Sequence, residues 1–126
     1  MGSRLLVFAG AVASLLAASP ALAHPKLLTS NPPANAVVKA MSRIQLGFSE
    51  RLIVQFSGVD VAMTSMPGMK MNAPMKMQAR SSIGADRKSI VLTFGKPLPR
   101  GTYKVDWHVV SADTHRVNGS YVFKVA

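Results

Sequence analysis

Apolar and polar residues alternate in four separate runs of this chain, and this period of two is the feature that most limits its fold. In the first run, RIQLGF, the side chains of Ile44, Leu46 and Phe48 share one phase. Such a pattern places one face of a strand on a core and leaves the other face in solvent. No comparable pattern predicts a helix after residue 23, apart from one short turn within residues 49–54. The four runs are residues 43–48, 88–95, 101–110 and 119–126.

Turn-forming residues separate these runs, at Asn31-Pro32-Pro33, at 84–86, at 97–101 and at Asn118-Gly119. Many short strands in about 100 residues are typical of an antiparallel β-sandwich or a small Greek-key barrel. We therefore predict an all-β, single-domain fold, cupredoxin-like or immunoglobulin-like. The chain has no cysteine, so its core must hold the fold without disulfides.

Residues 1–23 have the features of a secretory signal peptide. A short segment with one positive charge precedes an apolar run, and Pro20 and an Ala-x-Ala site ending at Ala23 follow. The apolar run is too short for a comfortable membrane span, which disfavours an uncleaved anchor. We predict cleavage after Ala23, export of the protein, and a mature domain of residues 24–126 that begins with His24.

The chain carries 15 Lys and Arg against five Asp and Glu, a net charge of +10. A basic protein can bind nucleic acid or a membrane surface. Here the positive charges are scattered, and no aromatic residues are interleaved with them to stack on bases. The pattern indicates a solvated surface and no nucleic-acid partner.

The segment MTSMPGMKMNAPMKM, residues 63–77, is unusually rich in methionine. A methionine-rich segment is more often part of a core, but Pro67, Gly68 and Pro74 interrupt any helix or regular strand here. The segment therefore resembles an exposed loop, and its thioethers could bind a soft cation such as Cu(I). The alternatives are core packing and docking of a partner. The six methionines are Met63, Met66, Met69, Met71, Met75 and Met77.

Three histidines suggest a second kind of site. Cleavage before His24 would leave its α-amine beside its imidazole, a pair of nitrogens that can chelate one metal; otherwise the ring is merely exposed. Asp113 and His115 lie two apart, so in an extended segment both side chains point the same way and offer N/O ligands suited to Cu(II). Alternatively, Asp113 only orients the ring or caps a turn. His108 has the opposite phase and is interpreted as a structural or surface histidine.

These motifs together resemble the CopC/PcoC family of periplasmic copper-resistance proteins, over the whole of residues 24–126. The match includes the start of the mature chain, a central strand, the methionine segment and the C-terminal hairpin with its Ser-x-Asp-x-His motif. The matching stretches are HPKLLTSNPPAN, IQLGFSERL, MTSMPGMKM and GTYKVDWHVVSADTHRVNGSYVFKV.

The resemblance implies a Greek-key β-barrel with two copper sites at opposite ends. Cu(II) would be bound by His24 with its amine, Asp113 and His115. Cu(I) would be bound by the methionine segment, which includes Met63, Met66, Met69 and Met75. Some family members have a histidine where this sequence has Met71, so an all-thioether site is expected, and we include Met71 and Met77 among its predicted ligands.

The function that follows is a monomeric, non-enzymatic copper carrier or buffer for copper resistance or homeostasis. Its expected partner is a CopD-like inner-membrane copper transporter or another periplasmic copper protein. A blue-copper protein needs a cysteine thiolate and is excluded by composition. The alternatives are a copper oxygenase with an N-terminal histidine and a purely structural β-sandwich module.

Overall fold

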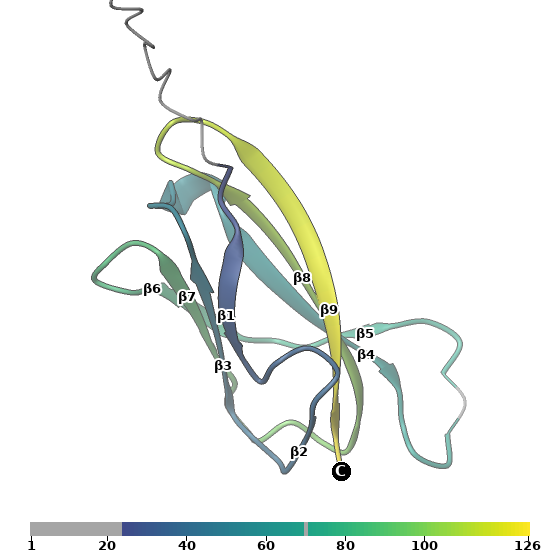
Figure 1. The fold of residues 1–126 in the computed structure, drawn as a ribbon. Coiled ribbons are helices and arrows are strands. Elements are labelled where there is room, and N and C mark those ends of the chain that lie inside the picture. The colour runs from purple at the N-terminus through teal and green to yellow at the C-terminus, as the bar shows by residue number, and fades with distance from the viewer. Residues whose placement is uncertain (1–23, 70) are drawn as a thin grey trace, which may run out of the picture.

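The computed structural model describes residues 24–69 and 71–126, so the predicted signal peptide and its cleavage site lie outside the described residues. Two β-sheets pack face to face, and one short 3₁₀-helix lies between strands of different sheets (Figure 1). The chain crosses repeatedly from one sheet to the other, as in a Greek-key sandwich. The predicted all-β fold is confirmed.

The first sheet has four antiparallel strands in the order β1-β3-β7-β6. Its strands are β1 (Leu27–Asn31), β3 (Arg43–Phe48), β7 (Ser89–Thr93) and β6 (Arg80–Ile83).

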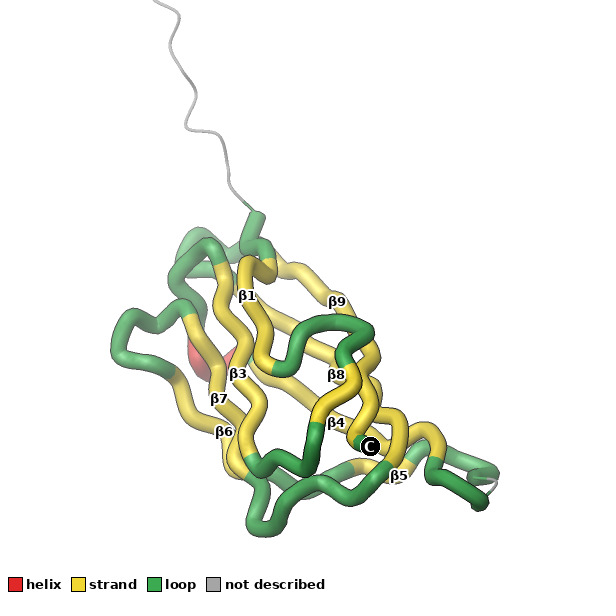
Figure 2. The backbone as a smooth tube through the Cα atoms, turned by 60° about the horizontal axis from the view of Figure 1, so that its bottom comes forward, coloured by secondary structure: helices red, strands yellow, loops and turns green. Residues whose placement is uncertain are grey.

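The second sheet has five strands in the order β2-β9-β8-β4-β5, and Figure 2 labels β9, β8, β4 and β5 of them. Within this sheet only the β2–β9 pair is parallel. The long β8–β9 hairpin forms its centre, paired from Gly101 with Val125 to Val110 with Arg116. Its strands are β2 (Val37–Val38), β9 (Arg116–Val125), β8 (Gly101–Val110), β4 (Gly58–Ser65) and β5 (Met75–Lys76).

The core lies between the sheets and consists of the residues that alternate along the strands, as the sequence predicts. Trp107 of β8 is half-buried and packs edge-on against Phe48 of β3 and tilted against Tyr121 of β9, with ring centroids 6.4 and 6.2 Å apart. Buried members of the predicted phases are Ile44, Leu46, Phe48, Ile90, Leu92, Phe94, Tyr103, Val105, Val109, Tyr121, Phe123 and Val125.

The 3₁₀-helix η1 (Val54–Phe56) begins where the short turn predicted at 49–54 should end, so the predicted position is wrong. Backbone hydrogen bonds explain the difference. The N–H of Leu52 donates to Arg87 O, and that of Ile53 donates to Val110 O, both at 2.8 Å. These long-range bonds hold the chain before Val54 in a non-helical conformation. No helix among residues 24–69 and 71–126 is long and apolar enough to cross a membrane.

The register of the second sheet places the two predicted metal-binding segments at opposite ends of the sandwich. Strand β4 runs antiparallel to β8, with Gly58 opposite His108 and Ser65 opposite Thr102. The turn that follows Val110 is therefore at one end, and the β4–β5 hairpin that follows Ser65 is at the other (Figure 1). At roughly 3.4 Å per residue, β8 separates these ends by about 30 Å.

Candidate metal sites

His24 and His115 meet at one end of the sandwich, although they lie near opposite ends of the described chain. Their rings pack edge to face, with centroids 4.8 Å apart and an interplanar angle of 88°. His24 is held near this end because the next residues are anchored: Pro25 is buried, and Lys26 exchanges hydrogen bonds of 2.8 Å with Ser49. The N-terminal segment thus brings an exposed imidazole to the β8–β9 turn.

Asp113 lies beside His115 in this turn, with Oδ2 3.0 Å from His115 Nδ1. The expectation that residues 113–115 are extended is wrong: Thr114 between them has a φ of 73°, in the left-handed region. The backbone N–H of Ser111 donates to His115 O at 2.9 Å, and that of Thr114 donates to Ser111 O at 2.8 Å. A closed turn, rather than a strand, therefore brings the carboxylate to the ring.

Ser111 is the residue that orients Asp113. It is 1% exposed, and its hydroxyl donates a hydrogen bond to Asp113 Oδ1. This bond, and to a lesser extent the contact with His115, lower the pKa of the Asp113 carboxyl below its usual value. Asp113 is thus held as an anion in a defined position. Ser111 is part of the matched family motif, but its role as a hydrogen-bond donor was not predicted.

His24, Asp113 and His115 form two adjacent pairs that share His115. Within the described part of the chain, no group of three or more His, Asp or Glu residues forms a ready-made metal cluster. In a chain that still carries residues 1–23, the main-chain nitrogen of His24 belongs to a peptide bond, so the predicted amine ligand would exist only after cleavage. His115 Nδ1 is buried and makes no hydrogen bond within the described residues, although Asp113 Oδ2 lies 3.0 Å away, so this nitrogen and the carboxylate could serve the same ion.

His108 lies apart from these pairs. It is exposed on β8, opposite Asn118 of β9, and covers Gly58 of β4 so closely that a Cβ on that glycine would lie 2.7 Å from its Cε1. This placement agrees with the interpretation of His108 as a surface or structural histidine.

At the other end, Met63 is not in an exposed loop as predicted. It belongs to β4, is 1% exposed, and lies opposite Met75 of β5. The missed signal is the alternation in VDVAM, where Val59, Val61 and Met63 share one phase and extend the core-facing side of β4.

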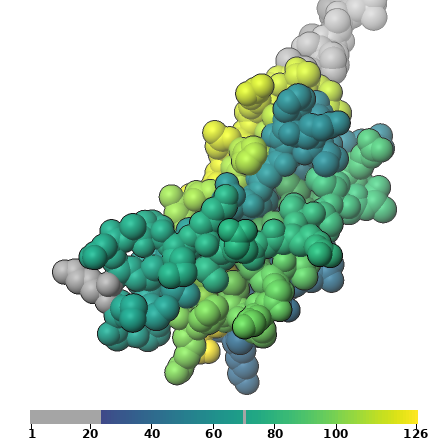
Figure 3. All heavy atoms as spheres, turned by 180° about the vertical axis from the view of Figure 1, so that it is seen from behind, coloured from purple at the N-terminus to yellow at the C-terminus, as the bar shows by residue number. Residues whose placement is uncertain are grey.

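The tip of the β4–β5 hairpin begins with a tight turn that pairs Met66 with Met69. The N–H of Met69 donates to Met66 O at 3.2 Å, and Gly68 between them has a φ of 73°. Proline followed by glycine at positive φ is typical of a type II turn. Met69 is 61% exposed and Met75 is 52% exposed, so both thioethers are accessible. Figure 3 shows this hairpin, in teal, projecting from one end of the molecule.

The remaining methionines lie closer to the core. Met66, Met71 and Met77 are partly buried and pack against it, and the N–H of Met77 donates to Val61 O at 2.8 Å. Met77 lies where the chain crosses towards β6, after β5 has ended. The six methionines therefore have three different environments, with Met69 and Met75 exposed, Met63 buried and the others intermediate.

Comparisons with known proteins identify the family. Residues 27–126 match the CopC domain. The chain is 50% identical over 105 residues to the copper resistance protein C of Escherichia coli, which covers 83% of each chain. It is also 50% identical over 114 residues to that of Xanthomonas campestris pv. juglandis, which covers 90% of this chain and 89% of the relative.

A solved structure shows the same fold. The crystal structure of PcoC, described as a methionine-rich copper resistance protein from Escherichia coli, superposes with a TM-score of 0.74 at 48% identity. The superposition covers 82% of this chain and 100% of PcoC. The domain match, the sequence identities and the shared sandwich agree, and the chain belongs to the CopC family.

Proposed function

We propose that this protein is a periplasmic copper-binding protein that carries or buffers copper for resistance or homeostasis. The observation that supports this most is the contact between His24 and His115, with Asp113 beside the second ring. These residues come from opposite ends of the described chain and meet at the surface, where a metal ion can enter and leave. The names of the relatives, copper resistance protein C, agree with this proposal.

The oxidised ion, Cu(II), is assigned to this end. Two imidazoles, a carboxylate held as an anion, and the α-amine released by cleavage after Ala23 would form an N/O ligand set, which suits Cu(II). Ser111 would support this set without touching the ion, because its hydroxyl fixes the Asp113 carboxylate beside His115.

The reduced ion, Cu(I), is assigned to the β4–β5 hairpin. Met69 and Met75 are exposed and are the thioethers that can first contact an incoming ion, and Met66 lies beside Met69 across the turn. Met71 and Met77 are partly buried and could join by small changes in side-chain conformation. Met63, although buried, is the cross-strand partner of Met75 and completes the predicted set of six.

A carrier function explains both ends without any catalytic step, because hard and soft ligands prefer different oxidation states of the same metal. We infer a monomer that exchanges copper with an inner-membrane copper transporter, CopD-like, or with another periplasmic protein. An oxygenase with an N-terminal histidine is less favoured, because Asp113 lies beside His115 at the position where oxygen would have to bind.

The test combines mass spectrometry of the exported protein with electron paramagnetic resonance (EPR) of its Cu(II) complex. We expect a mature chain that begins at His24 and a single Cu(II) spectrum with nitrogen hyperfine coupling. The His115→Ala variant should lose part of that coupling, whereas the matched control His108→Ala should keep it. An unchanged spectrum in His115→Ala would overturn the assignment of the Cu(II) site.

A further inference from the structure

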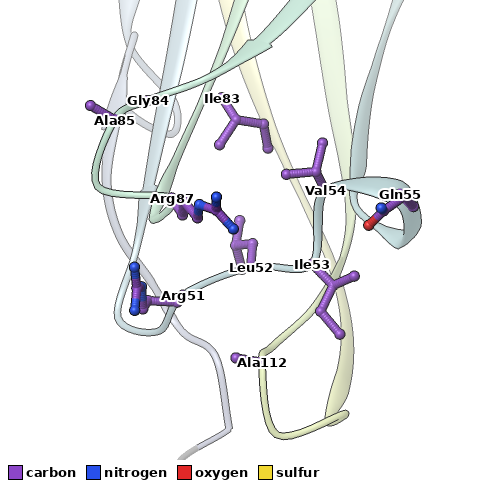
Figure 4. Close-up of a pocket in the computed structure, with 10 residues that line it drawn as sticks. All are labelled: Arg51, Leu52, Ile53, Val54, Gln55, Ile83, Gly84, Ala85, Arg87 and Ala112. Atoms are coloured by element: carbon purple, nitrogen blue, oxygen red, sulfur yellow. The ribbon is translucent and has the colours of Figure 1, made fainter.

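A pocket of about 760 Å³ lies beside the candidate Cu(II) site, between the β6–β7 turn and the chain that leads from β3 to η1 (Figure 4). Its apolar lining includes Leu52, Val54 and Ile83, and two arginines, Arg51 and Arg87, contribute the positive charge. Figure 4 shows the guanidinium of Arg87 near the middle of the hollow and Arg51 at its edge. Among the residues that the structure describes, no Asp or Glu lines this pocket.

Backbone hydrogen bonds join the three segments that form the walls. Besides the bond from Leu52 N–H to Arg87 O, the N–H of Ala112 donates to Arg51 O, also at 2.8 Å. The β6–β7 turn, the β3–η1 connection and the β8–β9 turn are thereby tied together. The pocket is therefore preformed, and a ligand would not have to order it.

Neither Arg51 nor Arg87 has an ion-pair partner in the described part of the chain. All five acidic residues lie in the described part of the chain, and the ion pairs found there are Lys76 with Asp60, Lys104 with Asp106, and His115 with Asp113. Glu50, the chain neighbour of Arg51, forms no ion pair and does not line the pocket. Asp86, the chain neighbour of Arg87, instead accepts hydrogen bonds within its own turn. Its Oδ1 accepts from Lys88 N–H at 2.9 Å and from Ser89 Oγ at 3.1 Å.

The rim of the pocket adds exposed apolar surface. Val54, which lines the pocket, is 47% exposed, and Phe56, two residues further along η1 and outside the lining, is 58% exposed. Protein interfaces are enriched in arginine and in aromatic residues, and their strongest contacts place a bulky apolar side chain in a pocket. Guanidinium groups pair best with carboxylates, often through two parallel hydrogen bonds. This chemistry fits a protein segment that carries both an acidic and a bulky apolar side chain.

We propose that this pocket is the docking site for an acidic segment of a protein partner, with a carboxylate on Arg51 and Arg87 and an apolar side chain against Leu52, Val54 and Ile83. Ala112 lines the pocket and directly precedes Asp113, so the bound segment lies next to the candidate Cu(II) site. Docking would serve copper exchange, and in this respect the proposal rests on the proposed function. The binding itself requires no metal.

The test uses copper-free ¹⁵N-labelled protein and the synthetic peptide acetyl-Gly-Asp-Phe-Glu-Gly-amide. We expect saturable amide shifts confined to residues 51–56, 83–87 and 112. Two matched peptides, one with Asn and Gln in place of the acids and one with Ala in place of Phe, should each bind at least about tenfold more weakly. Equal binding of the neutral peptide, or no saturable shift at these amides with the acidic peptide, would overturn the proposal.

The double variant Arg51→Gln with Arg87→Gln should bind the acidic peptide at least about tenfold more weakly, whereas Arg43→Gln, on β3, removes a charge outside the pocket and should bind normally. The double variant should keep the wild-type Cu(II) spectrum. That spectrum separates failure of this proposal from failure of the copper assignment. If the double variant binds the acidic peptide as tightly as the wild-type protein does, the docking site is wrong. If sodium benzoate binds the wild-type protein as tightly as the peptide does, the ligand is a small carboxylate and not a protein partner.

Discussion

The imidazole of His24 packs edge to face against that of His115, with ring centroids 4.8 Å apart. This contact joins the N-terminal segment to the β8–β9 turn, and two local features hold the two rings in place. The hydrogen bonds between Lys26 and Ser49 fix the approach of His24. The closed turn from Ser111 to His115 fixes the other ring. A metal bound between the rings would therefore cross-link two segments that already lie together.

Replacing Ser111 by alanine should impair Cu(II) binding without removing a ligand. The hydrogen bond from its hydroxyl lowers the pKa of the Asp113 carboxyl, so this pKa should rise towards the ordinary value of an aspartate in the variant. Loss of such an outer-shell contact typically weakens metal affinity about 10- to 100-fold. Carboxyl ¹³C NMR titration and Cu(II) competition measure the two effects.

The same hydrogen bond should make a pH-dependent contribution to folding. Because the pKa of Asp113 is lower in the folded state, this contribution is present above the unfolded pKa of about 3.9 and is lost as pH falls through the lower, folded pKa. In Ser111→Ala, the difference in unfolding free energy from wild type should therefore shrink on acidification. A difference that stays constant down to the acid limit would contradict this role of Ser111.

Truncation of Met63 should mainly lower the stability of the fold, whereas truncation of Met69 should mainly lower Cu(I) affinity. Met63 is 1% exposed, so Met63→Ala should cost about 2–5 kcal/mol of stability by leaving a cavity, whereas Met63→Leu should cost less than about 1.5 kcal/mol. Met69 is 61% exposed, so Met69→Ala should change stability by no more than about 0.5 kcal/mol and should weaken Cu(I) binding.

Urea unfolding and Cu(I) competition with a chromophoric chelator separate these effects. Leu28 is exposed at 66% on β1, outside the methionine hairpin, so Leu28→Ala serves as the control for truncating an exposed apolar side chain. Full Cu(I) affinity in Met69→Ala would remove Met69 from the ligand set.

A side chain added at Gly119 should destabilise the fold because Trp107 covers this glycine. A Cβ at this position would lie 2.1 Å from Trp107 Cζ2, so Gly119→Ala must displace the indole from its contact with Tyr121. Overpacking of this kind costs about 1–3 kcal/mol, and the Trp107 emission should shift. Gly95, where an added Cβ would meet open space, is the control. Equal stability of Gly119→Ala and Gly95→Ala would contradict this packing.

The strands were predictable because their signal is local. Ile44, Leu46 and Phe48 indicate a core face within six residues, and the structure buries all three. Met63 was misplaced for the opposite reason: the prolines and lysines that follow it suggested a loop, while Val59 and Val61 before it set the phase of a strand. Where a strand ends within the methionine-rich segment depends on its pairing with a strand that is distant in the sequence, here β8.

The sequence predicted that His24, Asp113 and His115 form one site, and the structure places them near one another in a geometry that the sequence did not predict. The Asp-x-His spacing suggested an extended pair, whereas Thr114 in the left-handed region and the bonds from Ser111 produce a turn. The meeting of His24 with His115 is a long-range contact, and only the family resemblance suggested it. No sequence motif predicts the arginine pocket, because hydrogen bonds between segments distant in the sequence bring the chain at Arg51 and the chain at Arg87 together.

We propose that His24, as the first residue of the mature chain, binds Cu(II) together with Asp113 and His115. The most direct measurement compares Cu(II) affinity, by competition titration, between mature protein beginning at His24 and the same protein extended by one serine. The extension turns the α-amine into a peptide nitrogen and leaves both rings in place. We predict a loss of at least about tenfold in affinity and a changed EPR spectrum. Equal affinity and an identical spectrum would contradict the account.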